Sequence, residues 1–223
     1  MKSDWTAETF AVLRKEAITE LRGRYGLYAT LLFSVMAVTA IGLASASTEP
    51  SPALAAGMFW VALLFAAVTG LARTFLLEEE QGTGDLLRLW AKPGPVFWGK
   101  LIYNFVLILV VSVILVPLFV LFVGVSVANW GLLVVALLAG CAALSSGISV
   151  CGALAARARG RSVLTGVLSI PVLFSVVLLG VGAVSVAFGA LVAGGWPSVA
   201  GLAGISLVFL AAGPYLFAGV WKQ

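Results

Sequence analysis

The sequence predicts an all-α polytopic membrane protein with six transmembrane helices and with both termini on the cytoplasmic side (N-in/C-in). Hydrophobic residues make up 62% of the 223 residues and charged residues only 10%, which is far from the composition of soluble domains. Two long segments, 101–156 and 162–221, contain no charge. Their apolar runs are continuous rather than alternating, which excludes a membrane β-barrel.

The length of the apolar runs sets the number of crossings. A bilayer core about 30 Å thick requires roughly 20 apolar helical residues, so each charge-free segment holds two crossings and the two earlier apolar runs hold one each. The predicted transmembrane domain covers 27–223, with helices at 27–46, 53–77, 101–124, 131–154, 163–188 and 199–221.

Lysine and arginine predict the orientation. With a cytoplasmic N-terminus, all 13 basic residues lie on the inner side or at its edge, and the outer loops carry one charge, Glu49. This distribution follows the positive-inside rule.

Residues 1–26 predict a cytoplasmic amphipathic helix that lies at the membrane interface. Phe10, Leu13, Ala17 and Leu21 repeat at spacings of three and four. Such a helix suits the inner membrane surface. An amphipathic extension without a specific role explains the pattern equally well.

Several function classes are disfavoured by residues that are missing. Ion-driven transporters and channels usually carry ionisable side chains within the membrane, and the predicted spans contain almost none. The chain also contains no histidine, which leaves out histidine-based catalysis and most metal sites. We therefore predict that the chain is not an enzyme and has no catalytic, cofactor or metal site.

The cytoplasmic loop 78–100, between the second and third spans, predicts a short amphipathic helix. Thr83 can cap this helix, Asp85 suits its first turn and Pro93 stops it. The apolar residues that share one of its faces are Leu86, Leu89 and Trp90. A helix tethered in this way by two spans can be pushed by a cytoplasmic partner, but a helix resting on the lipid surface explains the pattern equally well.

The segment FLLEEEQGTGDLLRLWAKPGPVFWGKLIYN, residues 75–104, resembles the signature of the CcmB family, the membrane subunit of the ABC complex for cytochrome c maturation. Residues 13–38 and 153–179 resemble the same family, so the likeness covers most of the chain. In the wider group of ABC-2 type permeases, an acidic residue followed by a glycine–threonine pair, here Gly82 and Thr83, marks the same loop.

The resemblance implies a permease-like subunit of the bacterial inner membrane that binds an ABC ATPase subunit through the helix of loop 78–100. The other implied partners are a haem-handling membrane subunit, a small single-span subunit, the periplasmic haem chaperone and membrane lipids, with two copies of the chain per complex and no nucleic acid. ATP would act through the ATPase subunit, and haem is the implied cargo of the complex. Because few side chains here could hold haem iron, we favour transmission of conformational work over passage of haem.

The residues predicted to form the ATPase-coupling interface are Glu78, Glu79, Glu80, Gly82, Thr83, Asp85, Leu86, Arg88, Leu89 and Trp90. The leucines and the tryptophan would form the apolar contact, and Asp85 and Arg88 would set its register. Glu78 to Glu80 would rigidify the join to the second span or pair with the partner. A weaker candidate for a second contact consists of Arg157, Arg159 and Arg161, which anionic lipids explain equally well.

Two alternatives from other classes stay open. An ABC-2 type permease could export a lipid, a drug or a glycan, and its spans should then carry features that suit the cargo. A non-transporting membrane scaffold should be insensitive to mutations in a partner ATPase.

Overall fold

The computed structural model describes residues 5–23, 25–71, 74–75, 78, 82, 84–155, 161–191 and 194–221. All regular structure in these ranges is helical. The helices are α1 (Trp5–Gly23), α2 (Tyr25–Ala44), α3 (Pro52–Leu71), α5 (Gly84–Trp90), α6 (Pro93–Val123), α7 (Trp130–Ala155), α8 (Arg161–Ala187) and α9 (Gly195–Trp221).

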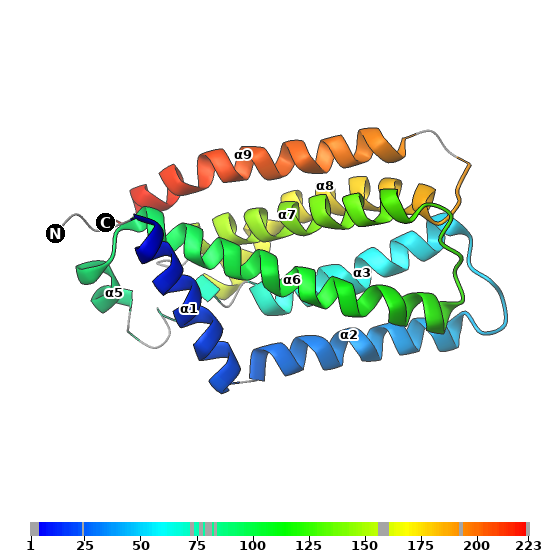
Figure 1. The fold of residues 1–223 in the computed structure, drawn as a ribbon, viewed down its shortest axis with the longest axis horizontal. Coiled ribbons are helices and arrows are strands. Elements are labelled where there is room, and N and C mark those ends of the chain that lie inside the picture. Colours follow the sequence, from blue (N-terminus) through cyan, green and yellow to red (C-terminus); the bar gives the residue numbers. More distant parts are fainter. Residues whose placement is uncertain are drawn as a thin grey trace.

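The long helices form a bundle, and α1 and α5 lie at one of its ends. Figure 1 shows α2, α3, α6, α7, α8 and α9 running lengthwise beside one another, with α1 crossing one end of the bundle and α5 beyond that end. The start of α1 and the end of α9 lie there as well. We call this the α5 end. Helix α1 packs mainly against α6, while α7 packs against both α8 and α9.

The described residues contain five to six candidate membrane spans. Helices α3, α6, α7, α8 and α9 are each long and apolar enough to cross a membrane. The sixth is obtained by joining α1 to the following helix as one span bent by 70°. The all-helical membrane architecture is thus confirmed over the described residues, whereas six spans with a first crossing at 27–46 stay a prediction.

Helix α6 begins earlier than the predicted third span. That span was expected from residue 101, whereas α6 starts at Pro93 and continues for 31 residues to Val123. Proline lacks an N–H group and has a fixed φ, so it suits the first turn of a helix, and Lys92 before it is extended. The proline expected to stop the loop helix therefore also starts the next one, and residues 93–100 belong to α6 rather than to a loop.

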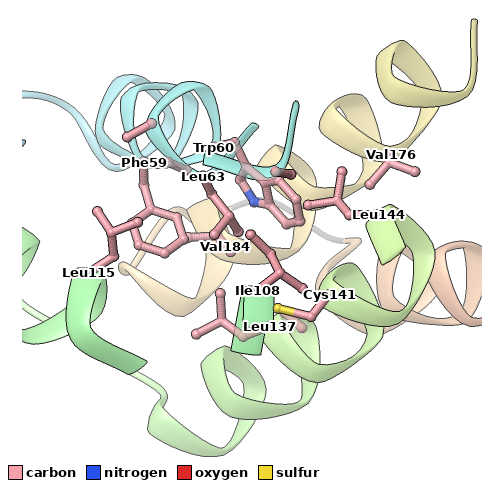
Figure 2. Close-up of a cluster of buried hydrophobic side chains, with 14 of the residues drawn as sticks. Phe59, Trp60, Leu63, Ile108, Leu115, Leu137, Cys141, Leu144, Val176 and Val184 are labelled. Carbon is pink, nitrogen blue, oxygen red and sulfur yellow. The ribbon is translucent and has the colours of Figure 1, made fainter. Parts of the chain in front are cut away.

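The bundle core is built around Trp60 of α3, which is fully buried. Figure 2 shows its ring among apolar side chains that include Leu144 and Val184. A Cβ atom on Gly140 of α7 would lie 2.4 Å from this ring, and one on Gly180 of α8 would lie 2.1 Å from it. Glycine at both positions therefore lets three helices approach one aromatic ring, in keeping with the small residues that membrane helix contacts favour.

Candidate coupling site

Helix α5 contains seven residues, Gly84–Trp90, and is preceded by a turn at Gly82. The backbone of Gly82 has a φ of 68°, in the left-handed region that side chains with a Cβ rarely adopt. Gly82 was predicted to belong to the ATPase interface, but the left-handed turn of the backbone before α5 is enough to explain why this residue is a glycine.

The two sides of α5 have different surroundings. Leu87 is half-buried and packs against an apolar cluster at the α5 end, whose buried members include Val12, Phe75, Val96, Phe97 and Leu101. Leu89 and Trp90 are 78% and 88% exposed. Adjacent large apolar side chains that the protein leaves uncovered are typical of a contact surface. Helix α5 thus rests on the bundle with one side and presents apolar groups on the other.

Helix α1 approaches α6 very closely at Gly99. A Cβ atom on Gly99 would lie 2.7 Å from the Val12 Cβ and 3.0 Å from the Thr9 carbonyl oxygen. The face of α1 that packs inward carries Thr9, Val12 and Glu16, all buried. The predicted apolar stripe is not this inward face, because Phe10 and Leu21 are each 65% exposed and Leu13 and Ala17 are only half-buried. The inward face therefore could not be identified from apolar spacing.

Four charged side chains meet where α1, α6 and the segment after α3 come together. We call Lys15, Glu16, Glu78 and Lys100 the ion cluster. The Lys100 Nζ lies 3.1 Å from Glu16 Oε1 and 3.0 Å from Glu78 Oε2, while the Lys15 Nζ lies 3.3 Å from Glu16 Oε1 and also contacts Glu78. Two ammonium groups thus face two carboxylates, and the cluster has no formal net charge.

Lys100 is the most buried member of the ion cluster. Its side chain is 1% exposed, and its ammonium group also donates to the Thr74 carbonyl oxygen and lies 5.2 Å from the centre of the Phe75 ring. A buried ammonium group is costly unless it is paired and hydrogen-bonded, and these partners meet both needs. Lys100 therefore ties both Thr74 and Glu78 to α6.

In the ion cluster, the charge pairs together shift the pKa values of Glu78 and Lys15 more than burial does. Burial alone would raise the pKa of the Glu78 carboxyl, but the ammonium groups of Lys100 and Lys15 hold that pKa below its ordinary value of 4.5. Burial alone would lower the pKa of the Lys15 ammonium, but Glu16 and Glu78 hold it above its ordinary value of 10.5. Both groups are therefore charged near neutral pH.

A second polar contact lies further along α6 toward the bundle core. The Asn104 amide donates to the Ser149 hydroxyl of α7 at 2.8 Å and to the Leu71 carbonyl of α3 at 3.4 Å. The Thr74 hydroxyl in turn donates to the Asn104 Oδ1. Because these groups are buried, each hydrogen bond also avoids the cost of an unpaired polar atom. The segment that leads to α5 is therefore connected to α1, α6 and α7.

The structure brings together only some of the predicted interface residues. Glu78 lies in the ion cluster, Gly82 forms the turn, and Leu89 and Trp90 form the exposed side of α5. The α5 backbone also includes three residues whose side chains the structure does not describe: Asp85, Leu86 and Arg88. Five predicted residues fall outside the described residues altogether: Glu79, Glu80, Thr83, Arg157 and Arg159. Arg161 begins α8, but its side chain is likewise not described.

Sequence reasoning missed Lys15, Glu16, Lys100 and Asn104. Lys100 was assigned to the end of the cytoplasmic loop 78–100, as one of the basic residues on the inner side of the membrane. A signal was present in the pair Gly99 and Lys100, a glycine beside a lone charge at the start of a long apolar run. Its partner Glu16, however, is distant in the sequence, so only the fold could reveal the pair.

Comparison with protein families gives one result that covers nearly the whole chain. The model of the family described as "CcmB protein" matches residues 7–222. Comparison with curated proteins gives no match. The matched range includes α5, the ion cluster and the helices α3, α6, α7, α8 and α9, each of which is long and apolar enough to cross a membrane. The chain therefore belongs to the CcmB protein family.

Proposed function

We propose that α5 receives ATP-driven movement from an ABC ATPase subunit and that the ion cluster passes this movement to α1 and α6. The observation that supports the proposal most is the asymmetry of the α5 end. Leu89 and Trp90 are uncovered, whereas the segment that leads to α5 is fastened to the bundle through Glu78 and Lys100.

Membership of the CcmB family makes the chain a membrane component, of permease type, in the haem-exporting ABC system for cytochrome c maturation. Such a subunit is not itself catalytic. In our proposal the ATPase activity resides in a separate cytoplasmic subunit, and the exposed side of α5 is its docking point. Interfaces of this kind depend on a few apolar or aromatic anchors, and Trp90 is well suited to that role.

The contacts at the α5 end provide a path for the movement. A push on α5 would reach Leu87, which packs on the apolar cluster around Phe97, and Glu78, which pairs with Lys100 of α6. Since α6 contacts both α1 and α7, a displacement of the first turns of α6 would also displace these two helices. Packed interfaces of this kind shift between discrete arrangements rather than deform continuously.

The distribution of charge supports a cytoplasmic location of the α5 end and six spans with both termini inside. Arg14, Lys15 and Arg22 lie on α1, Lys92 directly precedes α6 and Lys100 lies near the start of α6, whereas the loop at the opposite end, between α2 and α3, carries Glu49. By the positive-inside rule, this distribution supports a cytoplasmic α5, on the side where an ABC ATPase subunit would bind.

A mechanical role is favoured over passage of haem through this subunit. The chain contains no histidine, and both thiols, Cys141 and Cys151, are buried in the helix packing of α7. Haem would thus be the cargo of the whole complex. We propose that two copies of the chain act with the ATPase, a haem-handling subunit and a small single-span subunit to release the haem-loaded periplasmic chaperone from the bacterial inner membrane.

Purification from native membranes in mild detergent tests this function. The tagged wild-type chain should retain an ATPase together with haem-handling subunits, and Leu86→Asp and Trp90→Asp should lose the ATPase. Ala7→Asp, an exposed position on α1, controls for an added negative charge at the same end and should retain it. Recovery of an ATPase alone would favour a general exporter of a lipid, drug or glycan, and recovery of neither class from wild type would favour a scaffold.

A further inference from the structure

We propose that the outward side of α1 is a binding site for the phosphate headgroup of an anionic lipid. The inference concerns α1 alone and does not depend on what α5 binds. It rests on a basic groove, on the apolar stripe beside that groove, and on the place of α1 at the end of the bundle.

The groove has a volume of about 440 Å³ and is formed by one side of α1. We call it the basic groove; its lining residues are Ala11, Arg14, Lys15, Ile18, Thr19 and Arg22. Arg14 and Arg22 are exposed, and neither forms an ion pair within the part of the chain that the structure describes. Three cations along two turns of helix, with no acidic residue in the lining, are complementary to a phosphate group.

The apolar stripe beside the groove favours a lipid over an acidic protein. Phe10 and Leu21 are each 65% exposed, and Arg14 lies between them at helical spacing. Two large apolar groups would be costly in water, whereas an anionic lipid offers a phosphate to the arginines and acyl chains to the apolar groups. One amphiphile thus satisfies both halves of this surface.

The position of α1 places the groove at the height of the headgroups. Gly99, the contact point with Val12 of α1, is in the part of α6 just before the long apolar segment that follows Lys100. Helix α1 crosses the end of the bundle there (Figure 1). A helix in that position, with basic residues on one side and apolar residues beside them, has the geometry of an interfacial anchor.

Lys15 belongs both to the groove and to the ion cluster. Its side chain is 44% exposed and contacts Glu16 and Glu78. A phosphate in the groove would compete with Glu78 for this ammonium group. Because coupling between two binding events is reciprocal, weakening the Glu78 contact should strengthen lipid binding.

Titration of the purified full-length chain with phosphatidylglycerol in neutral detergent, followed by native mass spectrometry, tests the site. Wild type should bind phosphatidylglycerol more tightly than phosphatidylcholine. Arg14→Gln/Arg22→Gln should weaken phosphatidylglycerol binding by about 30-fold and leave phosphatidylcholine binding unchanged. Glu78→Gln should tighten phosphatidylglycerol binding.

Two controls separate the site from general charge and from misfolding. Arg14→Lys/Arg22→Lys preserves the charge and should retain the preference, and Lys92→Gln removes an exposed charge outside the groove and should have no effect. Unchanged phosphatidylglycerol affinity in the double glutamine variant, or equal affinity of wild type for both lipids, would overturn the proposal. So would loss of an acidic protein from that variant with lipid binding intact.

Discussion

Replacement of Lys100 by methionine tests whether the ion cluster holds the α5 end together. Methionine approximates the length of the lysine side chain and removes only its charge and hydrogen bonds. Since Lys100 is 1% exposed and Glu16 and Glu78 are 8% and 13% exposed, the substitution removes one of the two ammonium groups of the ion cluster and keeps both carboxylates. The formal charge of the four-residue cluster then changes from zero to −1 in a largely buried place.

The expected cost follows from this imbalance. Removal of one partner of a buried ion pair costs roughly 3–5 kcal/mol, and Lys15 can still pair with either carboxylate, so we expect a loss near the lower limit, about 3 kcal/mol. At about 2–4 °C per kcal/mol for a chain of this size, the apparent Tm should fall by roughly 6–12 °C.

Thermal unfolding of the purified chain in one detergent, at one scan rate, measures the effect. The double variant Lys100→Met/Glu78→Gln restores a balanced Lys15–Glu16 pair, so it should be more stable than the sum of the two single effects predicts, by at least about 1 kcal/mol. A fall in Tm below about 2 °C for Lys100→Met, or additive effects in the double variant, would refute the reasoning.

Three further perturbations have defined outcomes. Because the pKa of Glu78 in the folded chain is below its ordinary value of 4.5, the contribution of Glu78 to stability is complete above pH 4.5 and is lost as the pH falls through the lowered pKa. The Tm of wild type should therefore approach that of Glu78→Gln as the pH falls through this range, and a difference in Tm that does not change with pH would contradict the argument. Gly99→Ala should destabilise the chain by roughly 1–3 kcal/mol and make α1 more accessible to protease, whereas Gly57→Ala, whose Cβ would meet nothing within 4 Å, should not. Gly180→Ala should lower the Tm by overpacking, and adding Trp60→Leu should recover part of the loss if the tryptophan ring is the obstacle.

Much of the architecture was predictable because membrane spans are encoded locally. Continuous apolar runs locate the long helices, and Pro93 correctly separates α5, which ends at Trp90, from the next helix. The start of α6 at Pro93 was not predicted, because the third span was taken to begin after the last charge, Lys100, and a proline that stops one helix can also occupy the first turn of another. The residues around Pro93 do not indicate whether the proline only ends α5 or also begins α6; the three-dimensional structure is needed to decide this.

The candidate site was predictable only in part, for a different reason. The exposed side of α5 was accessible to pattern reasoning, because Leu89 and Trp90 are apolar residues in a charged loop. The ion cluster was not, because Glu16 and Lys100 are 84 residues apart and each resembles an ordinary interfacial charge when considered alone. The inward face of α1 was equally hidden, since it carries Glu16 instead of the apolar stripe.

Site-specific photo-crosslinking tests the central claim that α5 binds the ATPase subunit. A photoreactive phenylalanine derivative would replace Trp90, which is 88% exposed, and a control would carry the same group at Leu207 of α9, which is 65% exposed within a candidate membrane span. In native membranes, our account predicts an adduct of the ATPase subunit at position 90 and none at position 207. Adducts at position 90 that contain only lipid would contradict the account and would mean that α5 lies on the membrane surface.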